Sequence, residues 1–167
     1  MLIPVEVVGV RIEMPSNQPI VLLKEIEGTR FLPIWVGAVE ATAIAFAQQG
    51  LEANRPLTHD LIRDLLDRVG ATLTSTQITN LEDGVFYAEL IMKSSSGPLA
   101  PLSVRPSDAI AIALRTKSNI FVESALLDQA GIDIPEQVGS EDSAAGDQEL
   151  EAFREFLDGI NPDDFAG

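Results

Sequence analysis

The chain has 167 residues, of which 46% are hydrophobic, so it can form one domain with a sizeable core and an appendage. It contains no cysteine, which excludes disulfides, thiolate metal sites and cysteine nucleophiles. The formal net charge is −15, but residues 1–135 hold 16 acids and 10 bases, whereas residues 136–167 hold 10 acids and Arg154 alone. Because no basic cluster is present, binding to nucleic acid would need a metal ion or a local groove.

The N-terminal stretch MLIPVEVVGV has neither a basic region nor a cleavage-like site of small residues. No apolar run approaches the ~20 residues that a helix needs to span a bilayer. We therefore expect a soluble, cytoplasmic protein without a membrane partner.

The first 50 residues are predicted to form three strands and a helix. The first segment is rich in Val and Ile with partial alternation, which is typical of a strand. Glu27-Gly28 is a hairpin signal between the second and third strands, and Gly50 suits the position after a helix. The predicted strands cover residues 2–12, 19–24 and 30–36, and the predicted helix covers residues 40–49.

A second helix is predicted to begin near Thr58, which suits the N-cap position. Asp60 suits the positive end of the helix dipole, and Gly70 ends the pattern. Apolar residues recur in this segment at helical spacing and form one apolar stripe. These residues are Leu61, Ile62, Leu65, Leu66 and Val69.

The second half is predicted to repeat the order of three strands and a helix. Alternation with many Thr and Ser residues indicates the first of these strands, and the turn signal Glu82-Asp83-Gly84 separates it from the second. The predicted strands cover residues 71–79, 85–92 and 99–104, the helix runs to residue 115, and a short strand (119–122) and a short helix (124–130) follow.

Two segments of the chain resemble each other without a gap. PIWVGAVEATAIAFA begins at Pro33 and PLSVRPSDAIAIALR begins 68 residues later, so that Glu40 corresponds to Asp108. We predict an α+β fold in which duplicated strand-strand-strand-helix units, about residues 1–50 and 71–117, form a mainly antiparallel sheet packed with helices. Because alanine-rich helices can approach closely, the two repeat helices are expected to pack on each other or on the sheet.

The C-terminal part is predicted to be separate from a domain at residues 1–135. Residues 136–147 have the Gly, Ser and acidic bias of a flexible linker. Residues 148–158 carry apolar residues at helical spacing, so residues 148–167 are expected to contain an acidic amphipathic helix. We expect this helix to dock either on its own core or on a protein partner.

Four motifs together resemble the bifunctional nuclease family, formerly a bacterial domain of unknown function. They are LPIWVGAVEATAIA, RPLTHDLIRDLL, the FYAEL strand and RPSDAIAIALR, and the similarity covers about residues 1–133. The resemblance implies a compact α+β fold, a homodimer, and degradation of both DNA and RNA. Family members often carry Asp two positions before the Arg of the RPSDA motif, where this chain has Ser103.

Three acidic residues are candidate metal ligands: Glu40, Asp60 and Asp108. At the start of a helix, a carboxylate can simply stabilise the helix dipole, by about 0.3–1 kcal/mol. Alternatively, a pseudo-two-fold arrangement brings the equivalent residues Glu40 and Asp108 to one site, where they hold Mg²⁺ or Mn²⁺. No organic cofactor is indicated.

His59 is the only histidine and therefore the natural general acid or base near neutral pH, although a lone histidine beside a helix start is more often a packing residue. Arg55 and Arg105 each precede a proline and a helix start. Such an arginine either pairs with an acid in the first helical turn or holds a phosphate. Ser107 is expected to be an N-cap and is a further candidate for substrate binding.

Two functions remain open. In a metal-dependent nuclease, the catalytic residues are His59, Asp108 and Glu40, and a phosphate is held by Arg55 or Arg105. In the alternative, the chain is a non-catalytic homodimeric binding or regulatory module that receives a small anion or an acidic partner segment at its Arg-Pro motifs. Clustering of the candidate residues in a shared concave site favours chemistry, whereas burial of each in its own helix cap favours the module.

Overall fold

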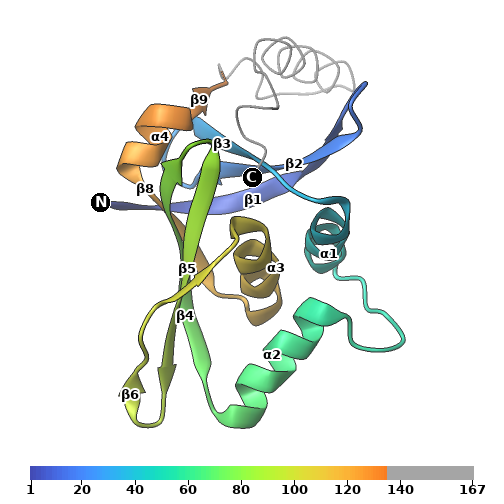
Figure 1. Ribbon diagram of the computed structural model, residues 1–167, viewed down its shortest axis with the longest axis vertical. Helices are drawn as coiled ribbons and strands as arrows, with labels where there is room; N and C mark the ends of the chain where they lie inside the picture. Colours follow the sequence, from blue (N-terminus) through green and yellow to red (C-terminus); the bar gives the residue numbers. More distant parts are fainter. Residues whose placement is uncertain (135–167) are drawn as a thin grey trace.

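A nine-stranded, largely antiparallel sheet organises residues 1–134, the part of the chain that the computed structural model describes (Figure 1). The strand order is β6-β5-β4-β8-β1-β2-β3-β9, and β7 pairs with β5. Among the strand pairs of these residues, only β4–β8 is parallel. The strands are β1 (Leu2–Glu13), β2 (Gln18–Glu25), β3 (Arg30–Trp35), β4 (Thr72–Glu82), β5 (Val85–Ser94), β6 (Gly97–Pro98), β7 (Leu102–Val104), β8 (Asn119–Glu123) and β9 (Ile132–Asp133).

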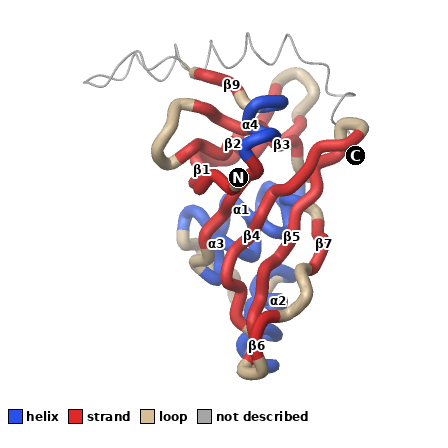
Figure 2. Tube along the Cα trace, turned by 90° about the vertical axis from the view of Figure 1, so that its left-hand side faces the viewer, coloured by secondary structure: helices blue, strands red, loops and turns tan. Residues whose placement is uncertain are grey.

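Four helices accompany the sheet in the described residues: α1 (Ala38–Gln49), α2 (Thr58–Val69), α3 (Pro106–Thr116) and α4 (Ser124–Ala130). α1 packs on β1 and β2, α3 packs on β4, β5 and β8, and both α1 and α2 pack on α3. The long β4–β5 hairpin lies in front of α2 and α3 in Figure 2. None of these helices is long and apolar enough to cross a membrane.

Helix α3 lies at the centre of the core. Each residue from 109 to 113 is at most 2% exposed, and three of these five residues are alanines. Small side chains allow the α3 backbone to lie close to α1 and to the sheet, as the alanine-rich pattern predicted. The N-terminal ends of α1 and α3 follow β3 and β7, so both helices begin where a strand ends.

Strand β8 joins the two halves of the sheet. It pairs antiparallel with β1 and parallel with β4, and it is the only link between these two strands in the sheet order of the described residues. The N-terminal ammonium of Met1 lies 2.8 Å from Glu123 Oε2, and the Ser124 N–H donates to the Met1 carbonyl. The start of the chain is therefore held by a segment more than 100 residues away.

Every strand and helix predicted within residues 1–134 is present in the predicted order, and the structure adds the short strands β6 and β9; three local predictions are corrected. The expected strand at 99–104 is shortened to β7 (Leu102–Val104), and the short strand β6 (Gly97–Pro98) lies before the expected range. Leu57 rather than Thr58 is the N-cap of α2, and its N–H donates to the Asp60 carboxylate at 2.9 Å. Arg105 rather than Ser107 is the N-cap of α3, because Pro106 occupies the first helical position, for which its fixed φ is well suited.

Other predictions about organisation are not tested by the described residues. The internal duplication stays a prediction, since similar element order in two halves does not by itself establish a repeat. The linker at 136–147 and the helix in 148–167 lie outside the described residues.

An ion-pair network that the sequence patterns did not predict ties the β2–β3 hairpin to α4. The Arg30 guanidinium donates from Nη2 to Glu25 Oε1 at 2.7 Å and from Nη1 to Asp128 Oδ1 at 2.6 Å. Glu25 is only 8% exposed. Hydrogen bonds from Arg30 outweigh the effect of burial and lower the pKa of Glu25, so this carboxylate stays ionised in the core.

We expect Arg30→Met to lower the free energy of unfolding by about 3 kcal/mol, because it leaves the buried Glu25 carboxylate without its partner. Urea denaturation followed by circular dichroism measures this loss. Arg68→Met is the matched control, since Arg68 is exposed on α2 and should change stability by less than about 0.5 kcal/mol. Equal free energies of unfolding for the two variants would show that the ion-pair network around Arg30 does not stabilise the fold.

Candidate functional site

Four of the candidate residues form one continuous chain of contacts across three helices. Arg105 Nη2 lies 2.8 Å from Glu40 Oε1 on α1, and Arg105 Nε donates to Asp108 Oδ2 at 2.8 Å. The other Asp108 oxygen, Oδ1, lies 2.9 Å from His59 Nε2 on α2. The structure thus brings together the two acids of the predicted repeat and links them through a single guanidinium.

Local sequence explains this convergence. Glu40 and Asp108 each lie in the first turn of their helix, and Arg105 is held in an extended conformation directly before α3. Gly37 precedes α1, and a Cβ atom at that position would collide with the Glu40 carboxylate. Because α1 and α3 pack on each other, the first-turn acids of both helices reach the same arginine.

His59 orients Asp108 from inside the protein. The His59 residue is 5% exposed, whereas the Asp108 side chain is 26% exposed and the Arg105 side chain 65%. Partial burial raises the pKa of Asp108, but hydrogen bonds from Arg105 and His59 outweigh this effect and hold the pKa below its ordinary value. An ionised carboxylate only accepts hydrogen bonds, so His59 Nε2 must carry the proton that it shares with Asp108.

Asp60 belongs to a separate ion pair between α2 and α3. Arg115 Nε donates to Asp60 Oδ1 at 2.7 Å, and the Leu57 N–H donates to Asp60 Oδ2. Burial raises the pKa of Asp60, but these two donors outweigh it and lower the pKa. The sequence patterns did not predict the role of Arg115. It follows Asp108 by seven residues, so both side chains lie on one face of α3. The adjacent residues His59 and Asp60 of α2 contact these two side chains.

The two remaining candidates for substrate binding differ in position. Ser107 is 7% exposed and lies in the wall of a cleft. Arg55 is exposed in the loop before α2, makes no hydrogen bond or ion pair within residues 1–134, and does not line that cleft. The matching Arg-Pro dipeptides therefore do not form one site in the described structure.

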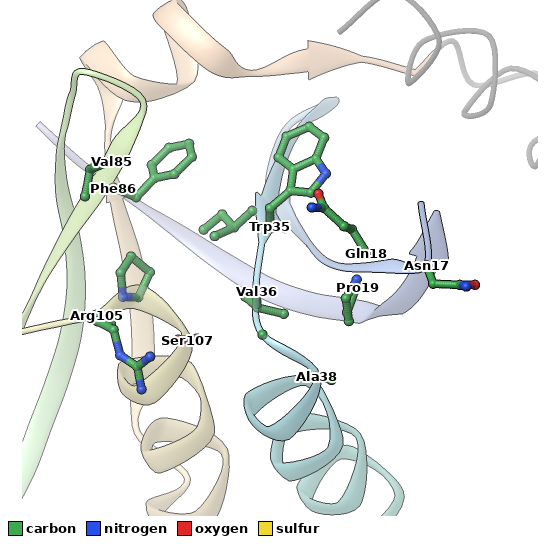
Figure 3. A pocket seen from close by; sticks show the side chains of 13 residues that line it. Asn17, Gln18, Pro19, Trp35, Val36, Ala38, Val85, Phe86, Arg105 and Ser107 are labelled. Carbon is green, nitrogen blue, oxygen red and sulfur yellow. The ribbon is translucent and has the colours of Figure 1, made fainter. Parts of the chain in front are cut away.

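A cleft of about 510 Å³ opens beside Arg105 (Figure 3). One wall carries Arg105 and Ser107 at the start of α3 together with Phe86 of β5. The facing wall carries Trp35 at the end of β3 and Ala38 at the start of α1. The N-terminal ends of both helices therefore meet at this cleft, where their free N–H groups and dipoles favour negative charge.

The metal-binding capacity of the described residues is limited. Residues 1–134 contain no cluster of three or more His, Cys, Asp or Glu side chains suited to hold a metal ion. Glu40 and Asp108 are nevertheless close enough for one guanidinium to contact both carboxylates. Mg²⁺ commonly uses one or two protein carboxylates, with water and substrate phosphates as its other ligands, and these two residues fit that pattern.

Comparisons with known proteins identify similar sequences in bacteria and plants. Residues 21–135 match the family model described as bifunctional nuclease domain. An uncharacterised protein of Mycobacterium tuberculosis is 51% identical over 162 residues, which cover 96% of each chain. Bifunctional nuclease 1 of Arabidopsis thaliana is 26% identical over 72% of this chain and 38% of its own length, and its namesake from Oryza sativa subsp. japonica is 26% identical over 79% and 40%.

Replacing Asp108 by Asn should destabilise the protein at neutral pH by roughly 1 kcal/mol, a figure that allows for solvent screening of this partly exposed carboxylate. Since the pKa of Asp108 is lowered on folding, its contribution is present above the unfolded pKa of about 3.9 and is lost as pH falls through the folded value. Urea unfolding at pH 7 and pH 3 tests this difference.

The exposed Glu6→Gln variant is the control, and it should match wild type at both pH values. A stability difference between wild type and Asp108→Asn that persists unchanged at pH 3 would contradict the assigned role of the carboxylate charge.

Proposed function

This chain belongs to the bifunctional nuclease domain family, and on that premise we propose that it cleaves phosphodiester bonds of DNA and RNA with the help of Mg²⁺ or Mn²⁺. The observation that supports the proposal most strongly is the convergence of Glu40, Arg105 and Asp108 beside a cleft at the start of two helices. The similarity to plant proteins named bifunctional nuclease supports the same activity.

Arg105 is the residue that binds the phosphate of the substrate. Its side chain is 65% exposed and its guanidinium already interacts with oxygen anions, so a phosphate can replace one or both carboxylates as its partner. Ion pairs of exposed side chains are weak, so this exchange of partners costs little free energy. The N–H groups at the start of α3, including that of Ser107, add a favourable environment for the same phosphate.

Glu40 and Asp108 are the residues that would hold the divalent cation, because their carboxylates are brought together by Arg105 and are partly accessible. A bound cation would supply positive charge that polarises the phosphodiester and activates water. Both oxygens of Asp60 already accept hydrogen bonds from Leu57 and Arg115, so its predicted metal role is not part of this proposal.

Proton transfer is assigned to Glu40, with His59 in a supporting role. Glu40 Oε2 accepts no hydrogen bond from residues 1–134, so it is available to take the proton of an attacking water. His59 is buried and faces Asp108, so it acts as a positioning residue that fixes the carboxylate orientation and does not contact the substrate.

One observation favours the alternative of a non-catalytic binding module. The single histidine is buried, so it cannot exchange protons with a substrate in the cleft, and Arg105 alone would suffice to receive an anion. The homodimer implied by the family resemblance stays a prediction in both cases.

Activity is tested with metal-stripped protein, labelled single-stranded RNA and duplex DNA, and Mg²⁺ or Mn²⁺ restored. Wild type should cleave, and Glu40→Gln, Asp108→Asn and Arg105→Gln should each lose roughly a hundredfold in rate, as is typical when one group that stabilises transition-state charge is removed. Titration calorimetry with Mn²⁺ should show weakened binding for the two carboxylate variants only.

Arg68→Gln, exposed on α2, is the matched control and should cleave at the wild-type rate. Cleavage by folded Asp108→Asn at the control rate would refute the proposed site. If wild type fails to cleave but binds a labelled oligonucleotide or phosphate, and Arg105→Gln abolishes that binding, the module is the correct function.

A further inference from the structure

The cleft beside Arg105 combines apolar walls with a polar end, where Arg105 is already paired with Glu40 and Asp108. Its walls include the side chains of Trp35, Val85, Phe86 and Pro106, whereas its polar end is formed by Arg105 and the N-termini of α1 and α3. Figure 3 shows the Trp35 and Phe86 side chains at the upper part of the cleft and Arg105 below them. Such a surface suits an occupant with an apolar face.

We propose that the acidic C-terminal segment of this same chain, residues 148–158, docks in this cleft. The segment QELEAFREFLD has four acids and one base, and it places Leu150, Phe153, Phe156 and Leu157 at the spacing of one helical face. The aromatic residues complement the apolar walls. An acid of the segment can pair with Arg105 by replacing Glu40 or Asp108, its present partners, and the N–H groups at the helix starts favour a carboxylate at the same end. The 162-residue match to the Mycobacterium tuberculosis protein is longer than residues 1–134 and so extends into the C-terminal region.

The described structure ends close enough for this docking. β9 pairs with Arg30 and Phe31 of β3, and the cleft begins at Ile34 and Trp35 of the same strand. Phe31 and Trp35 are four residue steps apart along the strand, a distance of about 13 Å. The chain from 134 to 147 can extend roughly 46 Å, so it spans that distance easily and keeps the segment at a high effective concentration.

A second apolar surface is a poorer acceptor for the same segment. Leu61, Leu65 and Val69 form an exposed stripe on α2. This helix lies at the opposite end of the molecule from β9 (Figure 1), and Asp64 and Asp67 lie on it. Asp64 is paired with Arg63, and Arg68 also lies on α2, so charge does not separate the two surfaces and position selects the cleft.

Trp35 is the only tryptophan of the chain and lines the cleft, so its fluorescence reports directly on docking. The test compares acrylamide quenching in the full-length protein and in the full-length double variant Phe153→Ser, Phe156→Ser. Docking predicts that the double variant shows about twofold stronger quenching and a red-shifted emission, because removal of the apolar anchors exposes Trp35 to solvent. Phe165→Ser, in the same C-terminal region but outside the segment, is the matched control and should behave as wild type.

A synthetic peptide of residues 148–158 provides the second measurement. Added to the double variant, it should restore the wild-type quenching, and the peptide with both phenylalanines replaced by serine should not. Identical quenching in wild type and double variant would overturn the proposal. Restoration by a single-stranded oligonucleotide but not by the peptide would also overturn it, and would assign the cleft to nucleic acid. The inference does not depend on catalysis, since every readout is the fluorescence of folded protein.

Discussion

A single guanidinium shared by two carboxylates holds the functional end of this protein together. Arg105 contacts Glu40 on α1 and Asp108 on α3, and Asp108 in turn receives a hydrogen bond from His59 on α2. Three helices are thus tied by one network, and two acids share one positive charge. The outer part of this network is solvent-exposed and the inner part is buried, so the exposed arginine can exchange partners while the buried histidine keeps Asp108 in place.

The same arrangement sets the balance between stability and function. An exposed ion pair contributes little to folding, so the protein loses little when an anion competes for Arg105. The deeper contacts that stabilise the fold lie elsewhere, in the alanine-rich face of α3 and in the Glu25–Arg30 pair. The charged residues beside the cleft can therefore stay accessible to solvent, because the stability of the fold does not depend mainly on them.

The order of the elements and the pairing of Arg105 with Asp108 were predictable because both depend on local patterns. Strand alternation, helical periodicity and the three-residue spacing of this pair are all visible in a short window. The contact between His59 and Asp108 depends on α2 packing against α3, and the role of Phe86 in the cleft depends on which strand lies beside α3. Such contacts join distant segments, and no local pattern determines them.

The two incorrect helix caps have a simple origin. Ser107 and Thr58 both have side chains that favour the N-cap position. At α3, Pro106 supplies a preset first helical residue and moves the start of the helix one position earlier than the serine. At α2, Leu57 is the N-cap, and its N–H donates to the Asp60 carboxylate, so the helix begins at Thr58 itself.

Strand β8 also constrains the order in which the protein can assemble during synthesis. It lies between β1 and β4, yet it begins only at residue 119. A nascent chain that has not yet released this segment can form the β1–β2–β3 meander and the β4–β5 hairpin, but it cannot join them into one sheet. Since contacts between distant segments slow folding, closure of the core depends on the last part of the domain to leave the ribosome.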